Sequence, residues 1–309
     1  MRGEHVIARE GRSVGARGEA GAVLRRWLEE NIDLFLPRVG ASAHPVEHML
    51  RLSEMSLILL GMSRRSVAGD ECYGAWAKKM ACILADGLRA VEEPIVAEFS
   101  ARSPGVRALL IAFPALEICT ATRFRTHDLV DRALESGNSD HRSGTDLELA
   151  FARDVAGLHA CRATISAEFA KVACGGATSR VMGRRELYDL SHLVFYATRM
   201  GRRKPGWNAV QAASVRQRLR TGGAARLRAR DLDPAAEAVM GLLMAGFPPC
   251  VFVDEATAAL SVAAETFGYV PAQSPEAGQM SHRLRHYHST LVGLSALAEF
   301  ERLQTTAGR

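Results

Sequence analysis

Three side chains that can exchange protons fall on one face of a predicted helix. Asp189, His192 and Tyr196 are spaced i, i+3 and i+7, which brings side chains onto the same side of an α-helix. A carboxylate one turn from an imidazole can fix the tautomer of the ring and raise its basicity, and a tyrosine can pass on a proton. We therefore predict an acid/base group with His192 at its centre and Tyr188 flanking it as a substrate-binding residue. The same pattern also fits a buried polar cluster that ties helices together.

A second group of such residues lies near the C-terminus, in the stretch HRLRHYHSTLVG. Its composition predicts a junction between a loop and an apolar helix that begins near residue 286, where side chains can reach the mouth of a cavity. We expect His288 to be catalytic and Tyr287 and Thr290 to bind substrate. The alternative is a polar helix start in which Ser289 or Thr290 caps the helix.

A segment that occurs twice indicates how these residues are positioned. RLSEMSLILLGMSRR (51–65) and DLSHLVFYATRMGRR (189–203) share Leu-Ser, an apolar middle, then Met, a small residue and Arg-Arg. Internal similarity of this kind is typical of repeated supersecondary units. Glu54 occupies the position of His192, and we predict that it faces the same substrate, unless it is simply an exposed Glu on a helix surface.

Composition and periodicity favour an all-α fold. Of the 309 residues, 48% are hydrophobic and 24% charged, as in ordinary globular proteins, and Ala, Leu, Arg and Glu are strong helix formers. Apolar residues at helical spacing predict helices at 21–36, 45–64, 70–100, 104–136 with a break at Pro114, 146–173, 186–200, 233–246, 254–267 and 286–303. We expect a helical-repeat architecture, an α/α toroid or a solenoid.

This domain is predicted to span 21–305, with possible halves at 21–140 and 145–305. Residues 1–20 are charged throughout and are predicted to form a disordered basic leader rather than a secretion signal. Because no apolar run is long enough to span a bilayer, we expect a cytoplasmic protein without membrane contact.

Several kinds of chemistry find no support in the sequence. The six cysteines form no metal-binding or redox motif and are expected to be reduced. No phosphate-binding loop, nucleophile elbow, kinase signature or dinucleotide fingerprint is present, so we expect no cofactor. We also expect no metal, although two sets of residues have loose ligand spacing. These sets are the pairs His44/His48 and His282/His286, and the group Glu117, His127, Asp189 and His192.

A basic block is the main feature of the charge distribution. Residues 199–230 contain ten Lys or Arg and no Asp or Glu, and the chain carries a net charge of +5. The stretches KPGW (204–207) and TGG (221–223) are expected to interrupt this block. Such a block can attract an acidic leader peptide or carrier protein, or it can be a solvated helix face. Arg199, at its start, is a predicted substrate-binding residue. We do not expect nucleic acid as a partner, because no aromatic stacking residues accompany the block.

The order of five segments resembles an actinobacterial family of uncharacterised helical proteins. The segments are LRRWLEENIDLF, HPVEHMLRLSEMSLIL, DLELAFARDVAGL, ELYDLSHLVFYATRMG and YHSTLVGLSAL. The resembling motifs place family positions at Tyr188, Ser191, His192, Phe195, Tyr196, Gly201, Tyr287, His288 and Thr290. Arg199 and Met200 depart from the family pattern, which is more acidic and aromatic there. The resemblance implies an association with genes for specialised metabolites, including modified peptides.

Together these observations predict a tailoring enzyme of a specialised-metabolite pathway. Its substrate would be a peptide or small molecule, and its reaction an elimination, cyclisation or isomerisation by acid/base chemistry in a helical cavity. The alternative is a non-catalytic helical scaffold that binds an acidic partner protein or peptide. An enzyme should bring His192, His288 and Glu54 together, whereas a scaffold should hold them apart.

Overall fold

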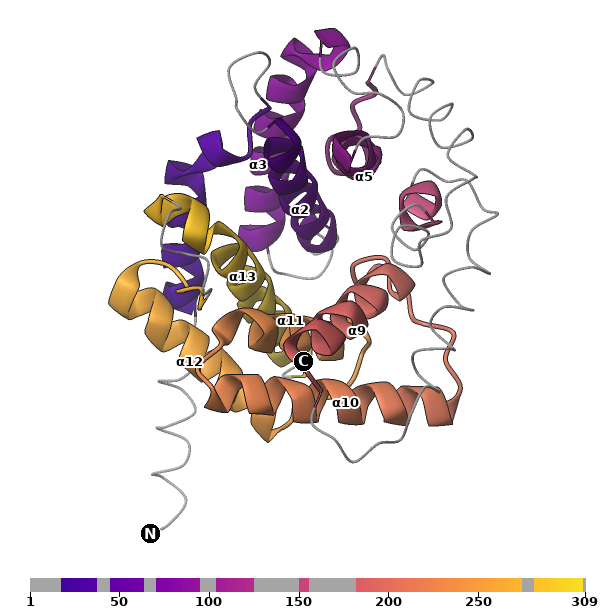
Figure 1. The fold of residues 1–309 in the computed structure, drawn as a ribbon, viewed down its shortest axis with the longest axis vertical. Coiled ribbons are helices and arrows are strands. Elements are labelled where there is room, and N and C mark those ends of the chain that lie inside the picture. The colour runs from indigo at the N-terminus through magenta and orange to yellow at the C-terminus, as the bar shows by residue number, and fades with distance from the viewer. Residues whose placement is uncertain are drawn as a thin grey trace. The chain divides into compact units, whose positions relative to one another are not determined.

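The computed structural model describes residues 18–37, 45–63, 71–94, 104–124, 150–155, 182–273 and 281–307. Every regular element in these ranges is a helix (Figure 1), which confirms the all-α prediction for this part of the chain. None of the described helices is both long and apolar enough to cross a membrane. The predicted leader lies outside the described residues except for 18–20, which are already helical.

The chain forms two compact units that are each discontinuous in sequence. Unit 1 contains residues 1–31, 176–194 and 207–309, and unit 2 contains residues 32–175 and 195–206. The predicted halves were instead continuous segments. Helix α9 (Arg184–Ala197) begins in unit 1, and its last residues belong to unit 2.

Unit 2 is built on three mutually packed helices, α2 (Pro45–Ser63), α3 (Glu71–Ala90) and α5 (Pro104–Thr120). The bounds of α2 confirm the predicted helix at 45–64. The break expected at Pro114 is wrong, because α5 continues through this residue. Phe113 and Leu116 on either side of it are fully buried, and this burial offsets the backbone hydrogen bond that a proline removes.

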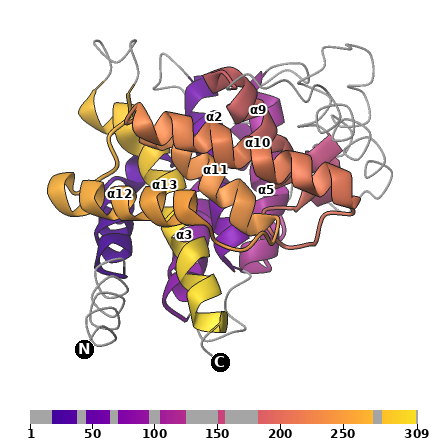
Figure 2. The ribbon, with the colours of Figure 1, turned by 90° about the horizontal axis from the view of Figure 1, so that it is seen from below.

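Unit 1 is organised around a buried central helix. Every residue of α11 (Leu232–Met244) from Pro234 onward is buried. It packs against α10 (Ala209–Arg228), α12 (Val251–Phe267) and α13 (His282–Ala307), as Figures 1 and 2 show. A helix at residues 18–30 belongs to the same unit and is followed by the short 3-10 helix η1 (Ile32–Leu34) of unit 2. The predicted helix at 21–36 therefore ends earlier than expected.

Two helix boundaries in unit 1 differ from the sequence-based expectation. The TGG stretch at 221–223 lies inside α10 rather than interrupting it. A Cβ on Gly223 would overlap Phe252 and Ala238, and one on Gly222 would lie 3.0 Å from Leu187. Both glycines thus allow neighbouring helices to approach closely, a role that outweighs their low helix propensity.

The second difference concerns the start of α13. This helix begins at His282 rather than near residue 286, so Ser289 and Thr290 lie inside it and do not cap it. Ring contacts support its first turns, since Tyr269 lies 4.8 Å from His282 and 4.6 Å from His286 between ring centroids. These contacts depend on Tyr269, which lies between α12 and α13, and the helix periodicity alone does not report them.

The two copies of the repeated segment have matching burial. Leu52 and Leu190 are both fully buried, and Met62 and Met200 are buried to within a few per cent. Glu54 and His192, the residues that differ, are both half-buried. The leucines lie on buried faces of α2 and α9, but Met62 lies inside α2 whereas Met200 lies three residues beyond the end of α9, so the match is one of burial rather than of helix position throughout.

Candidate functional site

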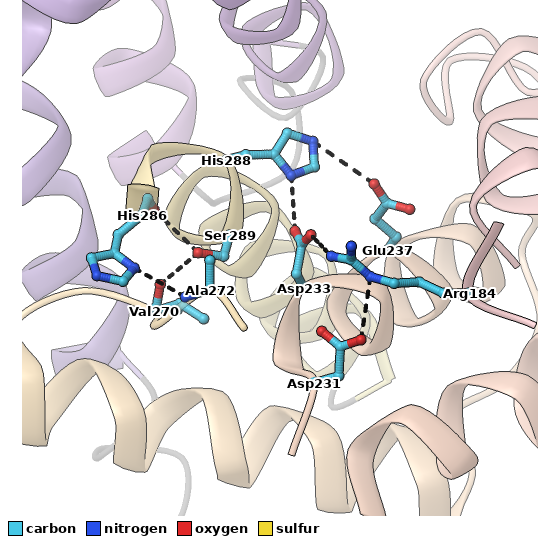
Figure 3. A network of polar contacts seen from close by, with 9 residues as sticks. All are labelled: Arg184, Asp231, Asp233, Glu237, Val270, Ala272, His286, His288 and Ser289. Atoms are coloured by element: carbon cyan, nitrogen blue, oxygen red, sulfur yellow. Dashed lines mark hydrogen bonds and ion pairs between the residues drawn. The ribbon is translucent and has the colours of Figure 1, made fainter. Parts of the chain in front are cut away.

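An imidazole between two carboxylates is the main polar feature of unit 1 (Figure 3). Nδ1 of His288 on α13 lies 2.8 Å from Oδ1 of Asp233 on α11. The other ring nitrogen, Nε2, lies 3.8 Å from Oε1 of Glu237. The His288 side chain is 25% exposed, whereas those of Asp233 and Glu237 are 15% and 3% exposed. A partly accessible imidazole is thus backed by two largely buried acids.

The spacing of the acids on α11 explains this arrangement. Asp233 lies in the first turn of the helix, and Glu237 follows one turn later on the same face. The positive end of the helix dipole favours a carboxylate in the first turn. Packing of α11 against α13 then places both acids opposite one imidazole.

Arg184 connects this pair to a third acid. Its Nη2 lies 3.0 Å from Oδ2 of Asp233, and its Nε lies 3.3 Å from Oδ2 of Asp231. Burial acts to raise the pKa of Asp233, but His288, Arg184 and the nearby His192 outweigh it and hold this pKa below its ordinary value. The pKa of Asp231 is raised by burial despite the charge of Arg184. Asp233 is therefore ionised at neutral pH.

His192 contributes a second imidazole to the same cluster. Its Nδ1–H donates to the carbonyl oxygen of Tyr188 at 3.1 Å, since a carbonyl can only accept. Burial lowers the pKa of His192 to about 4, and the charge of His288 adds to this effect, while Asp233 opposes it. The ring is therefore neutral at pH 7 and carries its lone pair on Nε2.

The geometry allows His288 to act as a base. Because the ionised Asp233 accepts from Nδ1–H, the lone pair of the neutral ring is on Nε2, the nitrogen closer to Glu237. A separation of 3.8 Å is too long for a hydrogen bond. When Nε2 takes up a proton, Asp233 and Glu237 can both stabilise the imidazolium. The cluster can thus hold and return one proton.

The structure brings together some of the residues predicted from sequence. His192 and His288 interact electrostatically within unit 1, and the ring of Tyr188 lies 3.8 Å from that of His192 between centroids. The ring of Tyr287 is perpendicular to that of His288 at 6.2 Å. These four residues, two from each predicted group, surround the same cluster.

The predicted partnership of Asp189 with His192 is not what the structure shows. Asp189 forms an ion pair of 2.9 Å with Arg185, and its side chain is 52% exposed. The carboxylate that acts on the pKa of His192 belongs to Asp233 instead. Sharing a helix face was not sufficient, because Arg185, one turn before Asp189, competes for the same carboxylate.

Three other predicted site residues, Tyr196, Arg199 and Glu54, lie in unit 2. Tyr196 is buried and stacks on Phe151, with 4.5 Å between ring centroids. Arg199 donates to the backbone oxygens of Asp154 and Val155, at 2.8 Å each. Glu54 lies half-buried on α2.

Thr290, in unit 1, also makes a contact that stabilises the fold. It is fully buried, and its hydroxyl accepts from the backbone N–H of Val270 at 3.2 Å. A buried hydroxyl with a backbone partner supports the neighbouring segment rather than a ligand. The prediction that Thr290 binds substrate therefore finds no support in its position.

Sequence reasoning missed Asp231, Asp233, Glu237 and Arg184. A signal was present in the stretch DLDPAAEAVMGLLM (231–244), where Glu237 stands alone among apolar residues. An acid at the centre of an apolar helix requires a buried partner. Nothing in the sequence named His288 as that partner.

Two sets of residues in the sequence have loose metal-ligand spacing. Among the residues that the structure describes, no group of three or more His, Cys, Asp or Glu has an arrangement suited to a metal ion. His44 and His127, which belonged to the two loose sets, lie outside the described residues.

The fold and the site define an all-helical protein with a buried histidine–carboxylate cluster. The chain matches a family described as Domain of unknown function (DUF6895) over residues 22–298. Because this match covers most of the chain, the protein belongs to that family, and the predicted resemblance to an uncharacterised family is confirmed at this level. No curated protein and no solved structure matches the chain significantly.

Proposed function

We propose that this protein is a tailoring enzyme that catalyses an elimination, cyclisation or isomerisation by proton transfer, with His288 as the general base. The observation that carries the proposal is the position of His288, held by Asp233 at 2.8 Å with Glu237 3.8 Å from the second nitrogen. A base of this kind requires an ionised orienting group and an accessible lone pair. Asp233 supplies the ionised group, and the 25% exposure of the His288 side chain supports access to the ring.

The second imidazole suits the same chemistry. His192 is neutral at pH 7, because its pKa is lowered to about 4, so it can accept a hydrogen bond or a proton from a substrate but cannot act as an acid. A protonated His288 can return its proton to a leaving group or a carbanion. A cyclisation or isomerisation needs the removal and return of a proton, and an elimination removes a proton while the leaving group departs with the proton that His288 returns, so none of the three requires a cofactor.

The substrate class is supported by association rather than by geometry. Sequence motifs around His192 and His288 resemble those of proteins encoded near specialised-metabolite genes. A modified peptide or a related small molecule is therefore the proposed substrate, and a cytoplasmic location is part of the same proposal. Fold and family alone do not carry an activity.

A chromosomal exchange in the source organism tests the proposal. The native gene is replaced by the His288→Gln variant, and high-resolution mass spectrometry compares the metabolites of the two strains. We expect one metabolite to disappear and its precursor to accumulate. The precursor is heavier by the mass of the eliminated molecule for an elimination, which is one water for a dehydration, or has equal mass and a different retention time for a cyclisation or isomerisation.

The matched control is His282→Gln, which changes an exposed histidine on the same helix. It should leave the metabolite profile unchanged at an equal protein level. If His288→Gln and His282→Gln both give the native profile, His288 is not catalytic. The scaffold that binds an acidic partner then becomes the better explanation of this fold.

A further inference from the structure

Two neighbouring helices of unit 1 carry exposed valines. The large hydrophobic residues with the highest exposed fractions in the described ranges are Val210, Val251 and Val262, at 75%, 71% and 62%. Val210 lies on α10, and the other two lie on α12. The two helices contact each other and lie along the same side of unit 1 (Figures 1 and 2). Val251 and Val262 share one face of α12. Val210 instead lies at the N-terminal end of α10, about 20 Å along that helix from Gly223, where α10 meets Phe252 of α12.

The two helices carry opposite charges. The exposed face of α10 includes Arg216, Arg220 and Arg228, and the helix contains no acidic residue. On α12, the exposed residues Glu255 and Glu265 share a face with Val251 and Val262, and this helix contains no Lys or Arg. The exposed face of α10 is therefore basic, and that of the contacting helix α12 is acidic.

We propose that this surface binds the same surface of a second copy of the chain, with α10 of each copy against α12 of the other. A two-fold axis between the helices produces this pairing, because it exchanges the basic and the acidic face. The arginines of each α10 then meet the glutamates of the other α12, and Val251 and Val262, which share the face of these glutamates, are buried between the copies. The surface is self-complementary in charge.

The neighbouring charges argue against a uniformly acidic partner. A polyanion or an acidic peptide that covers α10 would also meet the carboxylates of α12. Part of the basic block is moreover unavailable, since Arg199 and Arg203 are engaged within unit 2. The basic block of the sequence is thus reduced to the basic face of α10.

The expected size of the contact sets its strength. Helices of 20 and 17 residues are about 30 and 25 Å long. Two adjacent helices present a face about 20 Å wide, so the contact would bury about 1,200 Å² in total, at the low end for specific complexes. We expect a dimer of modest affinity that weakens as salt rises, because exposed charges are screened.

Two charge-reversed variants, measured alone and as a mixture, test the pairing of α10 with α12. One variant carries Arg216→Glu with Arg220→Glu, and the other carries Glu255→Lys with Glu265→Lys. Sedimentation equilibrium of the full chain at low salt should show a dimer for the native protein and monomers for each variant alone. An equimolar mixture of the two variants should again form dimers, because each supplies the charge that the other lacks.

A control and the contrary outcomes complete the test. Lys78→Glu with Lys79→Glu changes two exposed residues of α3 and should leave the dimer intact. Circular dichroism confirms that each variant is folded. A native protein that stays monomeric at every concentration, or a variant mixture that stays monomeric, overturns the proposal. In the first case the basic face of α10 remains open to an acidic partner.

Discussion

His286 and His288 stand two residues apart on α13 but serve opposite sides of the helix. Nδ1 of His286 accepts from the backbone N–H of Ala272 at 3.0 Å, and its ring stacks on Tyr269. His288 instead lies between Asp233 and Glu237. Two residues correspond to about 200° around a helix, so the same side-chain chemistry meets a loop on one side and two acids on the other.

The loop-facing side of α13 stabilises the fold. It is formed by His286, Ser289, Thr290 and Gly293. Ser289 donates to the backbone oxygen of Val270 at 2.6 Å, and Thr290 accepts from the N–H of the same residue. Burial lowers the pKa of His286 to about 4, and His282 and Arg285 add to this effect. The comparison shows that the partner of a histidine, rather than its neighbours in sequence, decides its role.

The largest expected effect is on enzymatic activity, which His288→Gln should lower far more than His286→Gln. The precursor that accumulates in the His288→Gln strain serves as the substrate for purified protein. We expect His288→Gln to lower the rate of product formation by about a hundred-fold or more, because general-base catalysis contributes factors of this size. His286→Gln should change the rate per folded molecule by only a few fold. Equal losses in both variants would contradict the division between the two sides.

The next effect concerns the pH dependence of stability. His286 has a folded pKa of about 4 against an ordinary value of 6.5, so between these values the unfolded chain binds more protons. The free energy of unfolding should therefore fall as pH drops from 6.5 to 4, with a contribution of up to about 3 kcal/mol from this residue.

Denaturant unfolding of the native protein and His286→Gln at several pH values measures this contribution. The difference between the two proteins should be constant above pH 6.5 and should shrink towards pH 4. Contributions from His192 and the carboxylates are common to both proteins and cancel. Parallel curves over the whole range would show that His286 is not held in the neutral form.

A smaller effect is expected from crowding the loop-facing side. A Cβ on Gly293 would lie 2.7 Å from Cγ2 of Val270. Gly293→Ala should therefore lower the free energy of unfolding by about 2 kcal/mol, whereas Gly206→Ala, with open space around it, should change it little. Urea denaturation compares the two. A stable Gly293→Ala would mean that the loop moves away at little cost.

The smallest effect is expected at the exposed end of the helix. Nε2 of His282 lies 2.9 Å from the hydroxyl of Tyr269, and its side chain is exposed. His282→Gln should change the free energy of unfolding by less than about 1 kcal/mol, as thermal denaturation can show. A larger loss of unfolding free energy would show that His282, in the first turn of α13, also contributes substantially to stability.

Much of the helical framework was predictable because it follows from apolar spacing within each segment. The bounds of α2, α11 and α12 agree closely with the predictions. The errors at Pro114 and at the TGG stretch have a common reason. Propensity assigns a cost to Pro and Gly in a helix, and only the packing around Phe113, Leu116 and Gly223 shows that this cost is offset.

The candidate site was predictable in part. His192 and His288 were singled out because few other residue types titrate near neutral pH, and the structure places them in one cluster. Asp233 and Glu237 were missed because their partner lies on a helix about 50 residues later in the chain. Tyr196 and Arg199 share the predicted segment with His192, but the unit division places them in other surroundings.

The sequence by itself determined that this chain forms helices, which of their faces are apolar, and which residues can exchange protons. These properties are local, since they depend on side-chain chemistry and on the helical period. Only the tertiary structure decided that His288 meets two carboxylates while His286 meets a loop. The packing of α11 against α13 sets these partners, and burial between them then sets the charges.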